Sequence, residues 1–200
     1  PKAVRDTLAS AIQDWQIQYD KLGLTPQELG DLNAVYIVGC GSAYHVGVTA
    51  QYVLEDLARI PVRVELASEF RYRTPLLPEK TLVIIISQSG ETADSLAALR
   101  QAKQYGASTL AIVNVVGSTI AREADHVFYT LAGPEIAVAT TKAYSTQLAA
   151  SYVLAIALAK ARGTLTEEDA ARMIGELETL PDKIEKLLEN KERIQWFASK

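Results

Sequence analysis

The sequence has little cysteine, with Cys40 alone among its 200 residues. A single cysteine excludes an internal disulfide framework and a zinc site built from several cysteines, and it favours a reducing compartment. Basic charge is not in excess either, because 20 Lys and Arg stand against 24 Asp and Glu, for a formal net charge of −4. No overall positive field is therefore available to bind nucleic acid or an acidic membrane.

Long hydrophobic runs are lacking as well. The longest apolar stretch, residues 148–159, is interrupted by Ser151 and is too short to span a bilayer. The opening residues, PKAVRDTLAS, do not have the charged and then apolar plan of a signal peptide. We therefore expect a cytoplasmic protein that has no membrane partner.

The sequence does have the composition of a globular protein, with 48% hydrophobic and 22% charged residues. Three apolar runs (VYIV, LVIII and LAIV) show almost no polar alternation, which is typical of strands buried on both faces. Helix-like stretches at 46–58 and 93–105 lie between such runs, and this alternation predicts an α/β fold with a parallel sheet covered on both sides. The predicted strands are residues 35–38, 62–66, 82–86, 110–113 and 127–131.

Helical segments are predicted on both sides of this α/β region. Before it, Val4, Leu8, Ile12 and Trp15 have helical spacing, and Thr25-Pro26-Gln27-Glu28 is a capping-box pattern that predicts a second, short helix. We assign residues 1–33 to an N-terminal helix and connector, 34–165 to the α/β domain, and 166–200 to a helical linker.

The part of the chain after Thr141 is predicted to be helical throughout. Residues 143–161 are alanine-rich and apolar over most of the helix circumference, which predicts burial. Amphipathic helices are predicted at 166–180, 182–190 and 192–199. Because the last of these has no cap or breaker before the sequence stops, we expect the 200 residues to be part of a longer protein.

Two polar loops follow predicted buried strands. Gly39-Cys40-Gly41-Ser42-Ala43-Tyr44 follows the first strand, and Ser87-Gln88-Ser89-Gly90-Glu91-Thr92 follows the third. If the strand order is 2-1-3-4-5, both loops lie at the switch point where doubly wound sheets bind ligands. Helix N-termini with glycine and small hydroxyls receive phosphate readily, and neither loop contains Lys or Arg. The alternative is that SQSGET is only a strand-to-helix turn with a Ser or Thr cap.

A third segment, Ala137-Val138-Ala139-Thr140-Thr141-Lys142, follows the fifth predicted strand and precedes the long helix. Thr140 or Thr141 would be a good N-cap, and that role alone could explain them. The functional interpretation is that this helix start closes over the ligand and that Val138 offers backbone groups to it.

Competing nucleotide motifs match less well. Gly39-Cys40-Gly41 begins like a dinucleotide fingerprint, but Tyr44 occupies the place of the third glycine. Glu65, at the end of the second strand, could imitate the acid that binds ribose, so a nicotinamide-binding domain stays open as an alternative. A P-loop needs Gly-Lys-Ser or Gly-Lys-Thr, and neither occurs.

Other reactive side chains have ordinary structural explanations. Cys40 has no paired histidine, which favours a small packing residue over a nucleophile. His45 and His126 lie far apart in the sequence, which favours a structural role for each over a shared metal site or an acid–base pair. The charges of SEFRYR (residues 68–73) could pair across a subunit interface, but we expect a solvated charged face.

The run SQSGETADSLAALRQAK, together with ELASEFRYR, GCGSAY and EIAVATTKAYSTQ, closely resembles the sugar isomerase (SIS) domain family. More specifically it resembles the first of the two SIS domains of the glutamine–fructose-6-phosphate aminotransferase family, the glucosamine-6-phosphate synthases. The resemblance implies a three-layer α/β/α sandwich with a five-stranded parallel sheet of flavodoxin-like order.

The resemblance also implies a set of substrate-binding residues. Those of the phosphate loop would hold the phosphate and nearby hydroxyls, and the others would line the site or contact the sugar. Thr140 stands where a serine is usual and Ser42 where a threonine is usual, whereas Ala43 replaces a serine, so one hydroxyl donor is missing. The implied residues are Gly41, Ser42, Ser87, Gln88, Ser89, Thr92, Val138 and Thr140.

The implied activity is that of the whole enzyme, which makes glucosamine 6-phosphate from fructose 6-phosphate and glutamine. The lysine, glutamate and histidine that carry this chemistry in the family belong to a second SIS domain or a neighbouring subunit, so no catalytic residue is assigned here. The resemblance implies no cofactor and no metal, ligands such as fructose 6-phosphate, glucose 6-phosphate or glucosamine 6-phosphate, and a homodimer formed through SIS domains. We expect these residues alone not to turn over, and a stand-alone single-SIS sensor or isomerase is the alternative.

Overall fold

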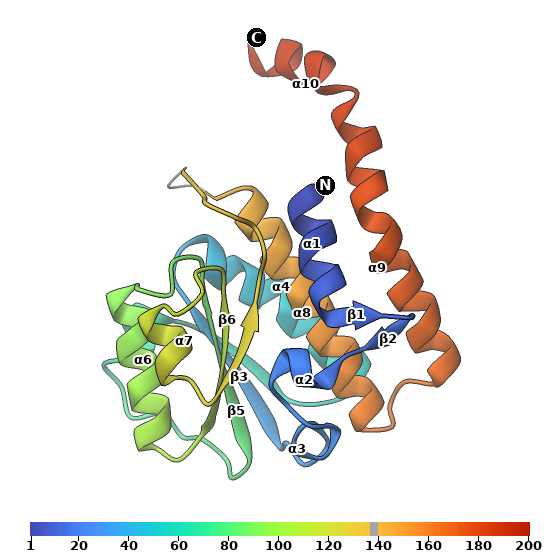
Figure 1. The fold of residues 1–200 in the computed structure, drawn as a ribbon. Coiled ribbons are helices and arrows are strands. Elements are labelled where there is room, and N and C mark those ends of the chain that lie inside the picture. Colours follow the sequence, from blue (N-terminus) through green and yellow to red (C-terminus); the bar gives the residue numbers. More distant parts are fainter. Residues whose placement is uncertain (137–139) are drawn as a thin grey trace.

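The computed structural model describes residues 1–136 and 140–200. Its centre is a parallel sheet of five strands in the order β4-β3-β5-β6-β7 (Figure 1). This is the predicted order 2-1-3-4-5, and β3 and β5 are buried at every residue, as the apolar runs predict. The strands are β3 (Ala34–Gly39), β4 (Val62–Leu66), β5 (Thr81–Ser87), β6 (Ser108–Val113) and β7 (His126–Tyr129).

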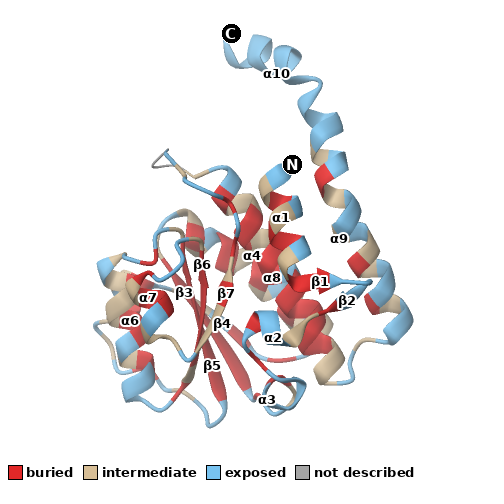
Figure 2. Cartoon of the chain, viewed as in Figure 1, coloured by how far each residue is buried: buried red, intermediate tan, exposed pale blue. Residues whose placement is uncertain are grey.

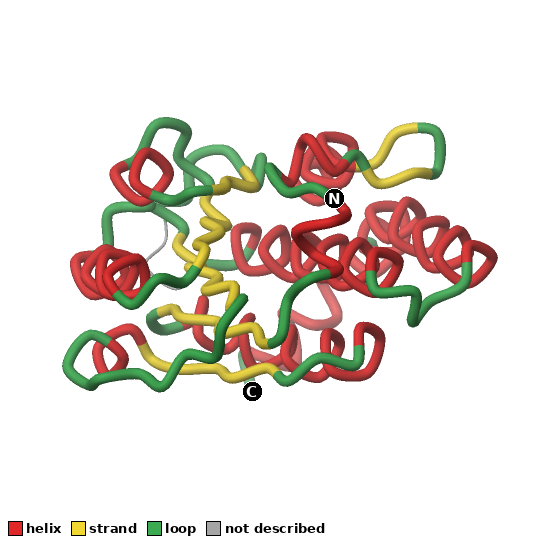
Figure 3. Tube along the Cα trace, turned by 90° about the horizontal axis from the view of Figure 1, so that it is seen from below, coloured by secondary structure: helices red, strands yellow, loops and turns green. Residues whose placement is uncertain are grey.

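Helices cover both faces of the sheet, so the predicted three-layer sandwich is confirmed (Figures 2 and 3). Alternate residues of a strand point to opposite faces. Ile37 and Ile84 therefore join one core, and Val38 and Ile85 join the other. The first core packs under α1 (Lys2–Ala11), α4 (Ser42–Ala58) and α8 (Lys142–Ala161), and the second under α5 (Ala67–Phe70), α6 (Ala93–Gln104) and α7 (Thr119–Glu123).

The N-terminal segment differs from its prediction at Trp15. Helix α1 ends at Ala11, and a hairpin of β1 (Ile12–Gln13) and β2 (Gln16–Ile17) follows. Asp14 and Trp15 have φ of 49° and 62°, the left-handed conformation that a two-residue hairpin turn requires. The placement of Ile12 and Trp15 on the first helix is therefore wrong.

The connector after this hairpin carries two short helices, α2 (Tyr19–Leu22) and α3 (Pro26–Gly30). The predicted capping box of α3 is confirmed. The Thr25 hydroxyl accepts from the Glu28 N–H at 3.2 Å, and the Glu28 carboxylate accepts from the Thr25 N–H at 2.8 Å.

The C-terminal helices follow the prediction except at Pro181. Helix α8 is buried over most of its surface as expected, but α9 (Glu167–Leu188) runs without a break through Pro181. The prediction of separate helices at 166–180 and 182–190 is therefore wrong, because Leu180 and Ile184 pack on the same core on either side of the proline. Helix α10 (Lys191–Ala198) buries none of its residues and projects from the body of the molecule (Figure 2).

Among the residues that the structure describes, no helix combines the length and the apolarity needed to cross a membrane.

Candidate functional site

The loops after β3 and β5 meet at the carboxyl edge of the sheet and border one pocket of about 240 Å³. The two strands are hydrogen-bonded neighbours, and this is why loops 48 residues apart in sequence come together, as the strand order predicts. Six of the predicted residues line this pocket: Ser42, Ser87, Gln88, Ser89, Thr92 and Thr140.

Two predicted residues are placed differently. Gly41 is the N-cap of α4, with φ of 55°, and it is not among the described residues that line the pocket. Val138 lies outside the residues that the structure describes.

The loop from Ser87 to Thr92 is a tight turn held by its own hydroxyls. The Ser87 side chain accepts from the Gly90 N–H at 3.1 Å and lies 3.3 Å from the Thr92 hydroxyl. The Ser89 hydroxyl accepts from the Glu91 N–H at 3.2 Å. Gly90 has φ of +66°, and a Cβ there would lie 2.0 Å from Oγ of Ser118. Only glycine fits at this position, and its turn sets the direction of the hydroxyls on either side.

Helix α6 begins directly after this loop. Thr92 is its N-cap, and the Thr92 side chain does not occupy the first-turn N–H groups. Those groups have no partner within the helix and carry partial positive charge, which favours an anion at this end. Asp94 in the same turn is paired with Arg71 at 2.6 Å, so its negative charge is compensated beside the pocket.

The pocket has a further wall, formed by the predicted Thr140 and by Glu135 and Gln147, which had not been assigned to the site. The Thr140 hydroxyl lies 3.1 Å from that of Ser42, which joins this wall to the loop after β3. Glu135 lines the pocket and accepts from the Ala143 N–H, at the start of α8, at 3.4 Å. Gln147 lines it too, although its side chain is only 1% exposed. The signal for Gln147 was a polar residue on the buried side of an otherwise apolar helix. Glu135 is the first residue of EIAVATTKAYSTQ, so the signal for it was the family resemblance of that segment.

Of the side chains behind competing hypotheses, Glu65 and His126 are engaged elsewhere, whereas Cys40 lies at the pocket. Glu65 forms an ion pair with Arg73, whose Nε donates to the carboxylate at 2.7 Å, so the Glu65 carboxylate already has a partner within the chain. Nδ1 of His126 lies 2.5 Å from the carbonyl oxygen of Gly23, far in sequence from the two loops. Cys40 is half-buried, packs against the second core and lines the pocket, with its sulfur 3.8 Å from the Ser95 hydroxyl.

The arginines of SEFRYR stay partly exposed, and each has a partner within the chain. Arg71 and Arg73 bind Asp94 and Glu65, with 30% and 36% of their side chains exposed. These ion pairs link α5 and its following turn to α6 and β4.

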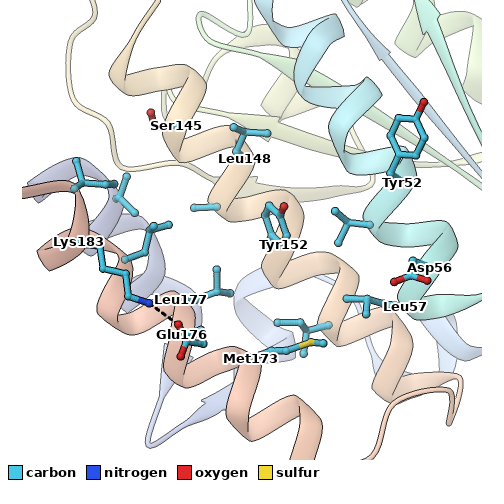
Figure 4. A pocket seen from close by; sticks show the side chains of 16 residues that line it. Tyr52, Asp56, Leu57, Ser145, Leu148, Tyr152, Met173, Glu176, Leu177 and Lys183 are labelled. Atoms are coloured by element: carbon cyan, nitrogen blue, oxygen red, sulfur yellow. Dashed lines mark hydrogen bonds and ion pairs between the residues drawn. The ribbon is translucent and has the colours of Figure 1, made fainter. Parts of the chain in front are cut away.

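A larger hollow of about 940 Å³ lies between α1, α4, α8 and α9 (Figure 4). Its walls are mainly apolar, with Leu57 from α4, Leu148 and Tyr152 from α8, and Met173 and Leu177 from α9. An ion pair between Glu176 and Lys183 lies on its α9 side (Figure 4). All the described residues that line it belong to helices, whereas the polar loops after β3 and β5 line the smaller pocket.

Comparisons with known proteins agree with this geometry. A family model described as "SIS domain" matches residues 28–157. Proteins named glutamine–fructose-6-phosphate aminotransferase [isomerizing] from Caldanaerobacter subterraneus subsp. tengcongensis and Clostridium acetobutylicum are 54% and 52% identical to it over 200 residues. Both matches cover 100% of this chain and 33% of the relative, so the chain spans about a third of the length of these curated relatives.

Solved structures extend the likeness to three dimensions. The C-terminal domain of glucosamine-fructose-6-phosphate aminotransferase from Francisella tularensis has a TM-score of 0.94 and 37% identity, covering 98% of this chain and 56% of that one. Glucosamine-6-phosphate deaminase from Thermotoga maritima has a TM-score of 0.64 at 24% identity, covering 94% of this chain and 56% of that one, and shares the fold alone.

Proposed function

The chain belongs to the SIS domain family, and from this premise we propose that its pocket binds a hexose 6-phosphate: fructose 6-phosphate, glucose 6-phosphate or glucosamine 6-phosphate. The observation that carries the proposal is the position of Ser87, Ser89 and Thr92 in one pocket beside the N-terminus of α6. Their hydroxyls and the first-turn N–H groups would donate to the phosphoryl oxygens. Gln88, whose amide oxygen has no partner among the described residues, would accept from a sugar hydroxyl.

The whole protein is proposed to be a glutamine–fructose-6-phosphate aminotransferase, of which this chain is the first SIS domain. Support comes from relatives of that name that match along the entire chain and are about three times as long. In this proposal the chain contributes binding residues, and the groups that move protons come from parts of the enzyme outside these 200 residues. The alternative of a stand-alone sugar-phosphate sensor or isomerase predicts a gene whose coding sequence ends near Lys200, whereas the aminotransferase predicts coding sequence on both sides.

A homodimer and a cytoplasmic location are further parts of the proposal. The apolar hollow between α4, α8 and α9 supports the first, because an apolar surface of this kind is typical of a protein–protein contact. The free thiol of Cys40 and the absence of a membrane-spanning helix among the described residues are compatible with the second.

The binding proposal is tested by titrating the chain with glucose 6-phosphate in a calorimeter. We expect Ser89→Ala combined with Thr92→Ala to weaken binding about 10- to 100-fold, because two hydrogen bonds to a charged group are lost. The fold should stay intact, since the Thr92 side chain does not cap α6. The matched control is Thr179→Ala with Ser199→Ala, two exposed positions outside the pocket. If the double variant Ser89→Ala, Thr92→Ala gave the same titration heats as the wild type, the assignment of these residues to the phosphate site would be refuted.

A further inference from the structure

The walls of the pocket differ in their hydrogen-bonding chemistry. The loop from Ser87 to Thr92 and the start of α6 offer hydroxyl and N–H donors. The wall formed by Glu135 and Gln147 offers oxygens that accept hydrogen bonds. A ligand that fills the pocket must therefore be anionic at one end and a hydrogen-bond donor at the other.

Glu135 occupies the place where a second anion would otherwise be favoured. Its carboxylate accepts from the Ala143 N–H in the first turn of α8, where the helix dipole stabilises negative charge. The nearby Lys142 is exposed and is not among the described residues that line the pocket. The helix start of α8 thus holds a carboxylate of the protein itself, whereas the first-turn N–H groups of α6 are left open by the Thr92 side chain.

Gln147 lines the same pocket and carries an unsatisfied acceptor. The residue is 1% exposed, and its Oε1 is buried without a hydrogen-bond partner among the described residues. Buried polar atoms are normally paired, so an unpaired oxygen on a residue that lines a pocket supports a donor supplied by a ligand. A neutral hydroxyl or an ammonium group can supply it, but a carboxylate or a phosphate dianion cannot.

We propose that Glu135 and Gln147 determine specificity, making the pocket selective for sugars with a single phosphate. Their acceptors would take the hydroxyl or amino groups of a hexose monophosphate, and the Glu135 charge would repel a second anionic group, as in a hexose bisphosphate or a phosphosugar acid. This inference rests on the proposed hexose 6-phosphate site and adds which ligands that site rejects.

The test is a calorimetric titration of the chain and its variants with glucose 6-phosphate, fructose 1,6-bisphosphate and 6-phosphogluconate. All three carry a 6-phosphate, and the last two carry a second anion. The wild type should bind fructose 1,6-bisphosphate and 6-phosphogluconate at least about tenfold more weakly than glucose 6-phosphate. Glu135→Gln should reduce this preference for glucose 6-phosphate about tenfold. The reason is that the repulsion between like charges a few ångströms apart at a protein surface is large enough to change affinity by about this factor. The glutamine oxygen can still accept from Ala143, so α8 keeps its cap. The matched control is Glu28→Gln, which removes a carboxylate bonded to the Thr25 N–H at the start of α3, outside the pocket, and should leave the preference unchanged.

The role of Gln147 has its own readout. Gln147→Met keeps the length of the side chain and removes the acceptor, so binding of glucose 6-phosphate should weaken about 3- to 10-fold. Binding of inorganic phosphate, which needs only the donor end of the pocket, should not change.

The outcomes separate this inference from the proposed function. A wild type that binds glucose 6-phosphate but keeps its full preference after Glu135→Gln would overturn the inference and leave the binding site standing. Equal weakening of all three ligands in Glu135→Gln, or equal weakening of glucose 6-phosphate and inorganic phosphate in Gln147→Met, would show a structural role and also overturn it. A wild type that binds none of these ligands would overturn the proposed function itself. A wild-type preference that shrinks in high salt, together with a smaller salt effect in Glu135→Gln, would support the charge of Glu135 as the cause.

Discussion

At the scale of single residues, the phosphate loop depends on Gly90. We expect Gly90→Ala to lower the free energy of unfolding by about 1–3 kcal/mol and to weaken glucose 6-phosphate binding, since a left-handed φ and a clash with Ser118 coincide there. Gly106→Ala is the matched control, because Gly106 has φ of +77° and open space around its Cβ position. Urea unfolding and calorimetry compare the two. Equal losses in both variants would show that the contact with Ser118 does not matter.

A second prediction at this scale concerns Asp125 and pH. Burial alone raises the pKa of Asp125, but hydrogen bonds from Lys103 and Thr109 outweigh it and lower the pKa. A lowered pKa in the folded state means that the carboxylate stabilises the fold above its unfolded value of about 4, and that this contribution is lost as pH falls through the folded pKa. Asp125→Asn should therefore lower the free energy of unfolding by about 1 kcal/mol at pH 7 and by less near pH 3. Urea unfolding at both pH values measures the difference in unfolding free energy between the wild type and the variant. A difference that does not depend on pH would contradict the lowered pKa of Asp125.

The candidate site could be predicted from sequence only where residues are close to a strand end. Ser87 and Thr92 flank one turn after a buried strand, so their proximity follows from local structure. Glu135 and Gln147 lie on either side of a helix start, and only the path of the chain after β7 brings them to the same pocket. Both are the end residues of EIAVATTKAYSTQ, which carries part of the family resemblance, but local patterns hold no information on that path, and this explains why neither residue was assigned to the site.

At the scale of elements, the sheet was predictable because its central strands are buried on both faces. Such strands must be apolar throughout, so their runs stand out in the sequence. The predicted end of the last strand is wrong by two residues, because the prediction extends to residue 131 but β7 ends at Tyr129. Beyond that point the Leu131 N–H donates to the Thr7 hydroxyl of α1 instead of to a neighbouring strand.

The two helix errors have a common cause, which is packing between distant elements. Pro181 removes one N–H from α9, yet contacts of Leu180 and Ile184 with the core keep the helix continuous. Trp15 leaves the helical pattern and lies against Gly175 of α9, where a Cβ would be 2.7 Å from the indole ring. Neither contact is visible in a local pattern.

Two helical glycines give a prediction at this scale. A Cβ on Gly47 of α4 would lie 2.9 Å from methyl groups of Ile37 and Val64 in the sheet, so Gly47→Ala should cost about 1–3 kcal/mol in unfolding free energy despite the better helix propensity of alanine. At Gly175 the clash is with the exposed Trp15 ring, which can move, so Gly175→Ala should be neutral or stabilising. Thermal unfolding of both variants measures the difference. A loss at Gly175 as large as at Gly47 would show that the Trp15 ring cannot move aside, and no loss at Gly47 would contradict the close packing of α4 on the sheet.

At the scale of the whole molecule, the strand order decides where the pocket lies. The chain winds in opposite directions from β3 to β4 and from β5 to β7, and the pocket lies where β3 and β5 end. The division into a connector, a domain at 34–165 and a helical linker stays a prediction at this scale.

The proposed homodimer leads to a test of the apolar hollow. Leu148→Glu should convert a dimer to a monomer, because it places a charge among the apolar side chains that line the hollow. Leu187→Glu, at an exposed position of α9 that does not line the hollow, is the matched control and should leave the dimer intact. Sedimentation equilibrium measures both. A wild type that is monomeric at high concentration would refute the proposal.

The central claim is that two loops without Lys or Arg form one phosphate site, and a crystal of the chain soaked with glucose 6-phosphate tests it most directly. The account predicts phosphoryl density within hydrogen-bond distance of the Ser87, Ser89 and Thr92 hydroxyls and of the first N–H groups of α6. The sugar should extend toward Glu135 and Gln147. Phosphoryl density at any other place on the molecule would contradict the account.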